Sequence, residues 1–218
     1  LNELDKELER RGLPFVRYAD DSMIFCKSKR AAMRVKESIT RFIENVLYLK
    51  VNKEKTVVSY VRGVKYLGYS FYVMKGKCQL TVHPKSKAKM KSRLKELTSR
   101  SNGWGYAKRK QKLKEYIRGW VGYYHLANMK RLLLETDEWL RRRIRMCIWK
   151  AWKKVKTKVA NLIRCGINKY KAYEWGNTRK GYWHIANSPI LATAISNNNL
   201  RAAGYATLMD AYLEWYPK

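Results

Sequence analysis

Cysteine and histidine are scarce in this chain, and neither is grouped. The four cysteines and three histidines are scattered over the 218 residues. Zinc sites and small disulfide frameworks need such residues in close pairs, so we expect neither kind of site. The cysteines are therefore predicted to be buried thiols in a reducing compartment. The residues concerned are Cys26, Cys78, Cys147, Cys165, His83, His125 and His184.

Long apolar runs are missing as well. No stretch approaches the roughly 20 apolar residues that cross a bilayer, and no signal peptide precedes the first polar residues. We therefore expect no membrane partner. The chain starts at Leu1 rather than Met, inside an amphipathic pattern, so we expect that further residues belong upstream.

Acidic residues are few: 17 Asp and Glu stand against 48 Lys and Arg, which gives a net charge of +31. Such an excess repels itself unless a polyanion neutralises it, and nucleic acid is the commonest large polyanion in a cell. The alternative, a surface charged for solubility, normally mixes both signs. The excess is concentrated in residues 84–155, which carry 22 basic and 5 acidic side chains. With 46% apolar residues the chain can still bury a core.

The first third has the pattern of an α/β segment. Residues 15–26 contain two β-prone runs around Ala19-Asp20-Asp21, which predicts a hairpin. An apolar stripe at helical spacing follows, and further strand-like runs come after it, with three glycines as predicted turn or bulge points. We expect a sheet covered by a helix. The stripe is Val35, Ile39, Phe42 and Val46; the runs are 56–61, 65–73 and 79–82; the glycines are Gly63, Gly68 and Gly76.

From Pro84 onward only helical patterns remain. Three apolar stripes predict a small helical bundle, with breaks at 101–105 and around Asn128. Ser188-Pro189 predicts a helix start, 197–199 a break, and 206–215 a further helix. The fold class is therefore predicted to be α+β, with domains at 1–83, 84–155 and 156–218. The stripes are Met90, Leu94 and Leu97; Leu113, Ile117, Trp120 and Tyr124; and Leu140, Ile144, Cys147, Ala151 and Val155.

The adjacent carboxylates Asp20 and Asp21 sit at the tip of the predicted hairpin. Two neighbouring negative charges repel each other, and a divalent metal ion is an effective counter-charge. An ordinary turn is the alternative, because Asp is a favoured turn residue and an exposed pair is harmless. These two residues alone leave both interpretations open.

The surrounding segments resemble, in order, five segments of group II intron reverse transcriptase/maturase proteins. The first three resemble the Tyr-x-Asp-Asp box, the next reverse-transcriptase block and the primer-grip block. The last two resemble the maturase-specific thumb and the C-terminal segment of that family. The segments are Phe15-Val-Arg-Tyr-Ala-Asp-Asp-Ser-Met-Ile-Phe25, Leu49-Lys-Val-Asn-Lys-Glu-Lys-Thr56, Val64-Lys-Tyr-Leu-Gly-Tyr-Ser-Phe71, Ile117-Arg-Gly-Trp-Val-Gly-Tyr-Tyr124 and Gly181-Tyr-Trp-His-Ile-Ala-Asn-Ser-Pro189.

The resemblance implies a partial polymerase palm, an antiparallel sheet with a helix, followed by an all-α thumb bundle and a small helical C-terminal segment that binds nucleic acid. It implies that Asp20 and Asp21 are catalytic Mg²⁺ ligands, with Tyr18 and Ala19 beside the primer end. Lys55, like Lys53, would neutralise or protonate the leaving pyrophosphate, although a solvated turn is an equal alternative. Gly68 would allow close approach of backbone to primer, and a β-bulge glycine is the alternative.

The resemblance also implies what the chain lacks. The family's third catalytic aspartate and its fingers lie upstream of the box, so we expect that the missing half either was cut off or is supplied by another chain. Asp5 is interpreted as surface charge rather than as that third ligand. Without paired cysteines or clustered histidines after the thumb, we expect no HNH-type endonuclease domain.

The partners implied are group II intron RNA, an RNA template with a DNA primer, and target DNA, in a cytoplasmic ribonucleoprotein of a bacterium. The implied function is RNA-directed DNA polymerase and intron maturase. The alternatives are an RNA-binding splicing cofactor without polymerase activity, or a general basic nucleic-acid binder.

The nucleic-acid contacts are predicted on the three basic helices. Arginine's planar fork suits phosphate, which favours the cluster at 141–145. Five interleaved tryptophans could stack on bases, yet aromatics at helical spacing are more often core. The predicted contacts are Lys87, Lys91, Lys95, Arg109, Arg141, Arg142 and Arg145; the tryptophans are Trp104, Trp120, Trp139, Trp149 and Trp152.

Overall fold

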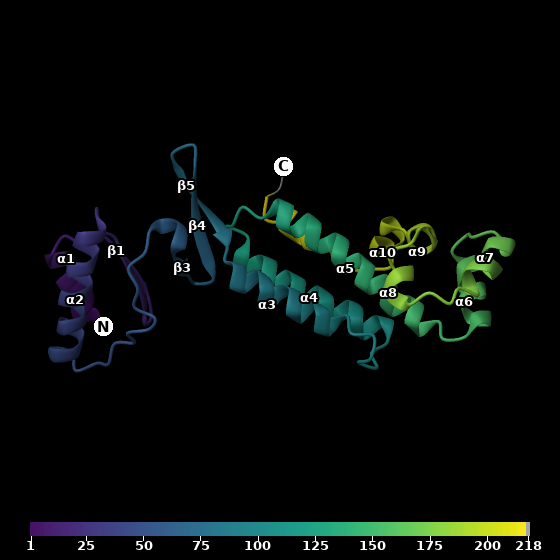
Figure 1. Ribbon diagram of the computed structural model, residues 1–218, viewed down its shortest axis with the longest axis horizontal. Coiled ribbons are helices and arrows are strands. Elements are labelled where there is room, and N and C mark those ends of the chain that lie inside the picture. Colours follow the sequence, from purple (N-terminus) through teal and green to yellow (C-terminus); the bar gives the residue numbers. More distant parts are fainter. Residues whose placement is uncertain (217–218) are drawn as a thin grey trace. The chain divides into compact units, whose positions relative to one another are not determined.

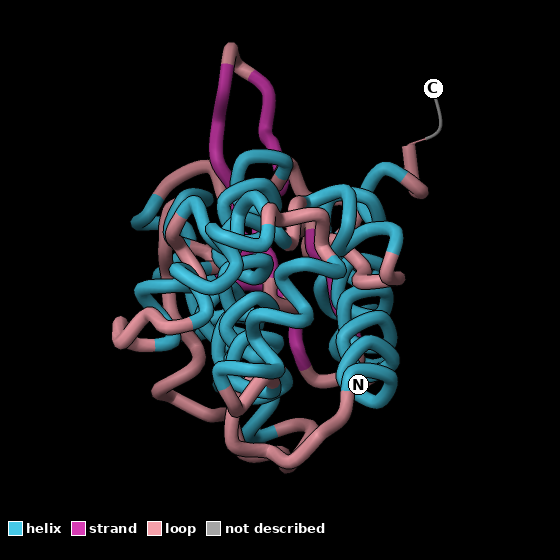
Figure 2. The backbone as a smooth tube through the Cα atoms, turned by 90° about the vertical axis from the view of Figure 1, so that its right-hand side faces the viewer, coloured by secondary structure: helices cyan, strands magenta, loops and turns pink. Residues whose placement is uncertain are grey.

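A computed structural model describes residues 1–216 of the chain, and the elements are labelled in Figure 1. The chain divides into two units, Leu1–Thr81 and Val82–Lys218, with the boundary inside a strand. Helix dominates, and the strands form short hairpins (Figure 2). The α+β class predicted from the sequence is confirmed. Of the predicted segment 156–218, the last two residues lie outside the described part.

The first unit is built around two helices that pack on one hairpin. The buried side chains of Leu4, Leu8 and Ile39 form its centre, and half-buried apolar residues from both strands, the second helix and the adjoining loops surround them. The amphipathic pattern at the start of the chain forms a helix from Asn2 to Arg10. The elements are α1 Asn2–Arg10, β1 Phe15–Tyr18, β2 Asp21–Ile24 and α2 Lys29–Asn45.

Helix α2 starts where the sequence offers a cap. The hydroxyl oxygen of Ser28 accepts a hydrogen bond from the Ala31 N–H at 3.2 Å, which satisfies one of the free donors of the first turn. The predicted apolar stripe is confirmed through Ile39 but not at its end. Val46 is 57% exposed because the helix stops at Asn45, one residue before it.

The strand predictions after α2 are only partly confirmed. Residues 56–61 form no strand; they run irregularly into a short 3₁₀ helix. The run 65–73 is broken by a two-residue turn in which Leu67 and Gly68 both have positive φ, +49° and +82°, as in a type I′ hairpin. Gly68 is thus a turn residue and not a bulge. The elements are the 3₁₀ helix Val61–Gly63, β3 Lys65–Tyr66, β4 Tyr69–Met74 and β5 Lys77–Val82, with sheet order β3-β4-β5.

The second unit begins with three long helices, as the stripes predicted. Pro84 is the first residue of α3, where its missing N–H costs no hydrogen bond, and the His83 side chain caps the helix. In the second predicted stripe, the buried position after Ile117 is Val121 rather than Trp120. Val155, the last residue of the third predicted stripe, belongs to the next helix and is exposed. The helices are α3 Pro84–Leu97, α4 Tyr106–Tyr124 and α5 Lys130–Ala151.

Six shorter helices complete the part of this unit that the structure describes, residues 82–216. The helix start at Ser188-Pro189 is confirmed, but 197–199 begins a helix instead of breaking one, because Ser196 caps it through the Asn199 N–H. The predicted helix at 206–215 is shorter, since Thr207 is its cap. The six are α6 Val155–Arg164, α7 Lys169–Gly176, α8 Tyr182–Ile185, α9 Pro189–Ala194, α10 Asn197–Ala202 and α11 Leu208–Leu213.

Helix α11 is held against α4 and α5 by contacts between residues far apart in the sequence. The buried carboxylate of Asp137 accepts hydrogen bonds from the backbone N–H groups of Leu208, at 2.8 Å, and Met209, at 2.9 Å. The Tyr212 hydroxyl donates to the carbonyl oxygen of Ala127 at 3.1 Å. The two bonds to Asp137 satisfy backbone donors at the helix start that have no partner within the helix.

None of the helices described in residues 1–216 is long and apolar enough to cross a membrane.

Candidate functional site

The predicted hairpin is present, and its two-residue turn is Ala19-Asp20. Ala19 has φ +54° and Asp20 does not have positive φ, the pattern of a type II′ turn that suits the twist of the flanking strands. Asp21 is the first residue of β2 and pairs with Tyr18. The four residues predicted to lie at the catalytic centre or beside the primer are therefore brought together at one tip.

The register decides which side of the hairpin these residues occupy. Cross-strand partners share a face, and Phe15 pairs with Ile24 on the face that packs into the core. Tyr18 comes three residues after Phe15, and Asp21 comes three residues before Ile24. Because successive side chains of a strand alternate between its two faces, Tyr18 and Asp21 lie on the face opposite the core. Tyr18 is 66% exposed, and Asp20 and Asp21 are exposed too. Both carboxylates are thus presented outward from a short, paired backbone.

The turn is braced from the inner face by Arg17. Its guanidinium binds both carboxylate oxygens of Asp5, with an Nε–Oδ1 distance of 2.7 Å, and Nη1 donates to the carbonyl oxygen of Ala19 at 2.9 Å. The hydrogen bond from Arg17 lowers the pKa of Asp5. Our interpretation of Asp5 as plain surface charge is corrected: it is partly buried and joins α1 to the turn through Arg17.

Tyr66 of β3 also lies near this tip. Burial, and next the negative charge of Asp21, raises the pKa of the Tyr66 hydroxyl. Its oxygen is buried and makes no hydrogen bond within the described residues. Neither Tyr66 nor the Asp5–Arg17 pair was predicted; Tyr66 lies inside the segment that resembles the primer-grip block, which was the only sequence signal for it.

As cation ligands, Asp20 and Asp21 offer hard oxygen donors, the type that Mg²⁺ prefers. Their exposure leaves the remaining coordination positions open to water or to phosphate oxygens. Within residues 1–216 no three His, Cys, Asp or Glu side chains are grouped closely enough to hold a metal ion. The pair therefore fits one part of a divalent cation site.

Two other predicted site residues occupy separate turns of the first unit. Lys55 follows Asn52, whose side-chain oxygen accepts the Lys55 N–H at 3.1 Å and so organises the turn. The side chains of Lys53 and Lys55 are exposed. Gly68 lies in the β3–β4 turn next to Tyr66.

Exposed lysines line α3 in the second unit. Met90 and Leu94 face its core, so side chains on the other sides of the helix reach solvent. Lys87, one of the predicted contacts, is half-buried, whereas Lys91 and Lys95 are exposed. We define the α3 lysine face as Lys85, Lys89, Lys91 and Lys95.

The arginines behave differently from the lysines. Arg109 is only 5% exposed and donates to Asn102 Oδ1 at 3.0 Å, so its prediction as a nucleic-acid contact does not fit its buried position. Arg142 donates to the Trp183 carbonyl oxygen at 3.0 Å, and Arg145 donates to the Ile195 carbonyl oxygen at 2.8 Å. Arg143 donates to two carbonyl oxygens at the end of α3. Much of this cluster holds helices together.

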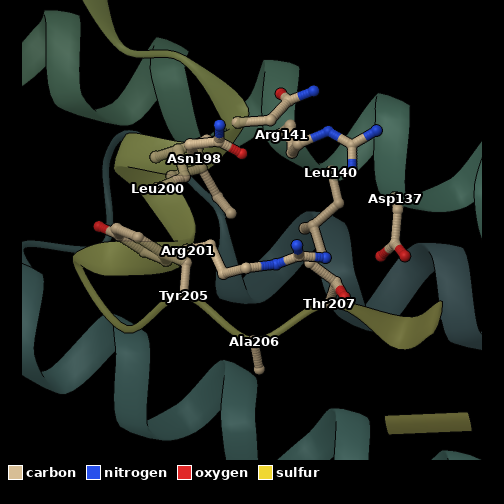
Figure 3. Close-up of a pocket in the computed structure, with 11 residues that line it drawn as sticks. Asp137, Leu140, Arg141, Asn198, Leu200, Arg201, Tyr205, Ala206 and Thr207 are labelled. Carbon is tan, nitrogen blue, oxygen red and sulfur yellow. The ribbon is translucent and has the colours of Figure 1, made fainter. Parts of the chain in front are cut away.

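Arg141 instead lines a cavity of about 260 Å³ between α5, α10 and the segment leading into α11. Figure 3 shows Asp137, Leu140 and Arg141 entering from α5, opposite residues 198–207. Arg201 on the far side is paired with Asp210 at 2.8 Å. Two guanidinium groups therefore flank a small polar space.

Of the five tryptophans weighed as stacking platforms, none is exposed. Trp149 and Trp152 are buried in the core, and the other three are half-buried. Among the described tryptophans the exposed ones are Trp183 and Trp215, which were not predicted.

Comparison with known families places both units. Residues 1–71 match the family model described as reverse transcriptase (RNA-dependent DNA polymerase), and this match contains the hairpin. Residues 87–166 match the model described as group II intron, maturase-specific domain, and this match contains most of the segment 84–155 in which the positive charge is concentrated. No curated protein matches the chain.

Proposed function

The chain belongs to the group II intron reverse transcriptase/maturase family, and we propose that it supplies the catalytic hairpin and the RNA-binding thumb of an RNA-directed DNA polymerase that also assists intron splicing. The observation that carries this proposal is the outward-facing Asp20-Asp21 tip within the segment that matches reverse transcriptases. A maturase-specific domain follows it in the same chain.

In this proposal Asp20 and Asp21 hold Mg²⁺. The cation, when bound, supplies charge stabilisation for nucleotidyl transfer from the primer 3′-hydroxyl. The chain's own residues fix the geometry: Arg17 holds the Ala19 carbonyl oxygen, and Asp5 holds Arg17. The exposed ring of Tyr18 offers an apolar face beside the primer end. Lys55 and Gly68 stay proposals for the pyrophosphate and primer contacts.

Primer extension tests the polymerase part. The family's fingers and third aspartate precede the hairpin in sequence, so the assay uses protein with that segment supplied in the same chain or added in trans. We expect the 218-residue chain alone to give no extension, and Asp20→Ala to abolish extension by the completed enzyme.

Glu37→Gln is the matched control, because it removes one negative charge from an exposed acid of the same unit. The control should leave extension intact. Normal extension by the Asp20→Ala enzyme would refute the catalytic assignment.

The helical unit is proposed to bind intron RNA and the template–primer duplex, chiefly through the α3 lysine face. Target DNA is a further proposed partner of residues 156–216, in a cytoplasmic ribonucleoprotein. The support is the concentration of positive charge in residues 84–155 and the exposure of the α3 lysines.

A splicing cofactor without polymerase activity is the second candidate, favoured by the match to the maturase-specific domain. Splicing of the cognate intron at low Mg²⁺, with and without the protein, tests this role. If the Asp20→Ala protein still stimulates splicing, the splicing function does not depend on the catalytic hairpin. No stimulation by wild-type protein would leave the polymerase function alone.

A further inference from the structure

A cluster of aromatic rings and cations lies where α8 packs on α5. The guanidinium carbon of Arg142 lies 3.8 Å from the ring centre of Trp183. Nε and Nη2 of the same guanidinium donate to the Trp183 carbonyl oxygen, and these hydrogen bonds hold the guanidinium beside the indole ring. The neighbouring ring of Tyr182 lies near the Lys150 ammonium, at 5.1 Å, and the Arg100 guanidinium, at 5.3 Å.

The two aromatic residues have separate roles because successive residues of a helix point about 100° apart. Tyr182 is half-buried and packs against Met146, Cys147 and Ala186, which anchors α8. Trp183 is 38% exposed. Since Arg142 covers one side of the indole, the exposed surface remains for another planar group.

From this arrangement we infer that Trp183 is a stacking site for an unpaired nucleobase, with Arg100 and Lys150 attracting the adjoining phosphates. The inference rests on the proposed nucleic-acid binding by the helical unit and adds a specific contact in residues 167–216, outside both family matches. Three cations around two aromatic rings suit a polyanion that carries π faces. An apolar peptide would gain nothing from that charge.

Oligonucleotides with and without bases separate stacking from general charge. We compare binding of the full chain to single-stranded oligomers of equal length, one with bases and one abasic throughout, in ribose and deoxyribose forms. Wild type should prefer the oligomer with bases, and Trp183→Ala should reduce that preference by roughly 5- to 150-fold, the range for base–aromatic stacking. The log–log salt slope should not change, because no charge is removed.

Trp215→Ala is the matched control, since Trp215 is the other exposed tryptophan of this unit but already stacks on His125, with ring centres 4.2 Å apart. It should keep the base preference, and Trp183→Phe should keep most of it. Should Trp183→Ala fail to fold, photocrosslinking of wild type to a 4-thiouridine oligomer decides: a crosslink at 182–184 supports the site, and crosslinks only elsewhere overturn it.

A base preference unchanged in Trp183→Ala would also overturn the inference. That result is distinguishable from failure of the proposed function, in which the wild-type chain would bind neither oligomer. A preference limited to ribose would assign the site to RNA, and an equal preference would extend it to single-stranded DNA.

Discussion

The α3 lysine face gives a prediction whose size follows from the structure. Its four lysines are exposed, and the only ion pair described on α3 is Arg93–Glu96, so all four are available to phosphates. Each duplex phosphate neutralised contributes about 0.9 to the log–log dependence of affinity on salt. Replacing Lys85, Lys89, Lys91 and Lys95 by Gln should therefore flatten the slope by at most about 3.6.

Between 0.05 and 0.2 M salt, a slope difference of about 3.6 corresponds to a roughly 150-fold smaller loss of affinity. Filter binding to a structured RNA over this range measures it. Thermal melting of the variant should match wild type, because the replaced side chains lie in solvent.

A matched variant tests whether the salt dependence of RNA affinity comes from the position of these lysines or from the total positive charge of the unit. Lys154, Lys156, Lys169 and Lys171 are also exposed, and they lie on or next to α6 and α7. Replacing them by Gln removes the same charge from the same unit. Equal flattening by both variants would mean that the general field attracts RNA. An unchanged slope in the α3 variant would refute contact there.

Three further predictions concern carboxylates. Asp137→Ala should lower the free energy of unfolding, measured in urea, by about 1–3 kcal/mol, because it leaves the buried N–H of Leu208 without a partner. The control Asp210→Asn breaks an exposed ion pair and should lower it by at most about 1 kcal/mol. Equal losses in the two variants would contradict this reasoning. Hydrogen bonds from Arg10 and Arg11 lower the pKa of Glu7 to about 2, so its contribution to stability is present above its ordinary pKa near 4.5 and is lost as pH falls toward 2. Acid melts of Glu7→Gln should lack that component. Asp5→Asn should raise the Mg²⁺ concentration needed for half-maximal primer extension by the completed enzyme, since the turn loses its brace; an unchanged Mg²⁺ titration would leave Asp5 structural.

Local patterns predicted the elements whose ends carry strong signals. The hairpin around Asp20, the three long helices and the Ser188-Pro189 start were read from periodicity and capping residues, all of which act within a few positions. Gly68 was predicted as a turn or bulge point, and the structure confirms the turn. The residues around it were still predicted as one strand-like run, because a reversal that needs only two positive φ values leaves a β-prone sequence unchanged.

For the candidate site, too, the sequence predicted what depends on neighbouring residues and not what depends on contacts between distant ones. The tip residues 18–21 are adjacent in sequence, so one motif located them. The partner of Arg17 is 12 positions away, and Arg143 bonds to residues 45 and 48 positions away. Charge counts cannot distinguish an arginine that binds carbonyl oxygens of its own chain from one that is available to RNA. Arg142, Arg143 and Arg145 therefore hold the chain's own helices together, while the α3 lysines are exposed; the RNA contacts of both groups stay predictions.

The contact between Asp137 and the start of α11 also sets a delay during protein synthesis. Leu208 follows Asp137 by 71 positions. At about 5–20 residues per second, a ribosome needs roughly 4–14 s to make that stretch. For that interval the Asp137 carboxylate has no helix to hold, and the surfaces of α4 and α5 that α11 later covers are open to water. The nascent helical unit can complete its packing only after this delay, and until then that face stays uncovered.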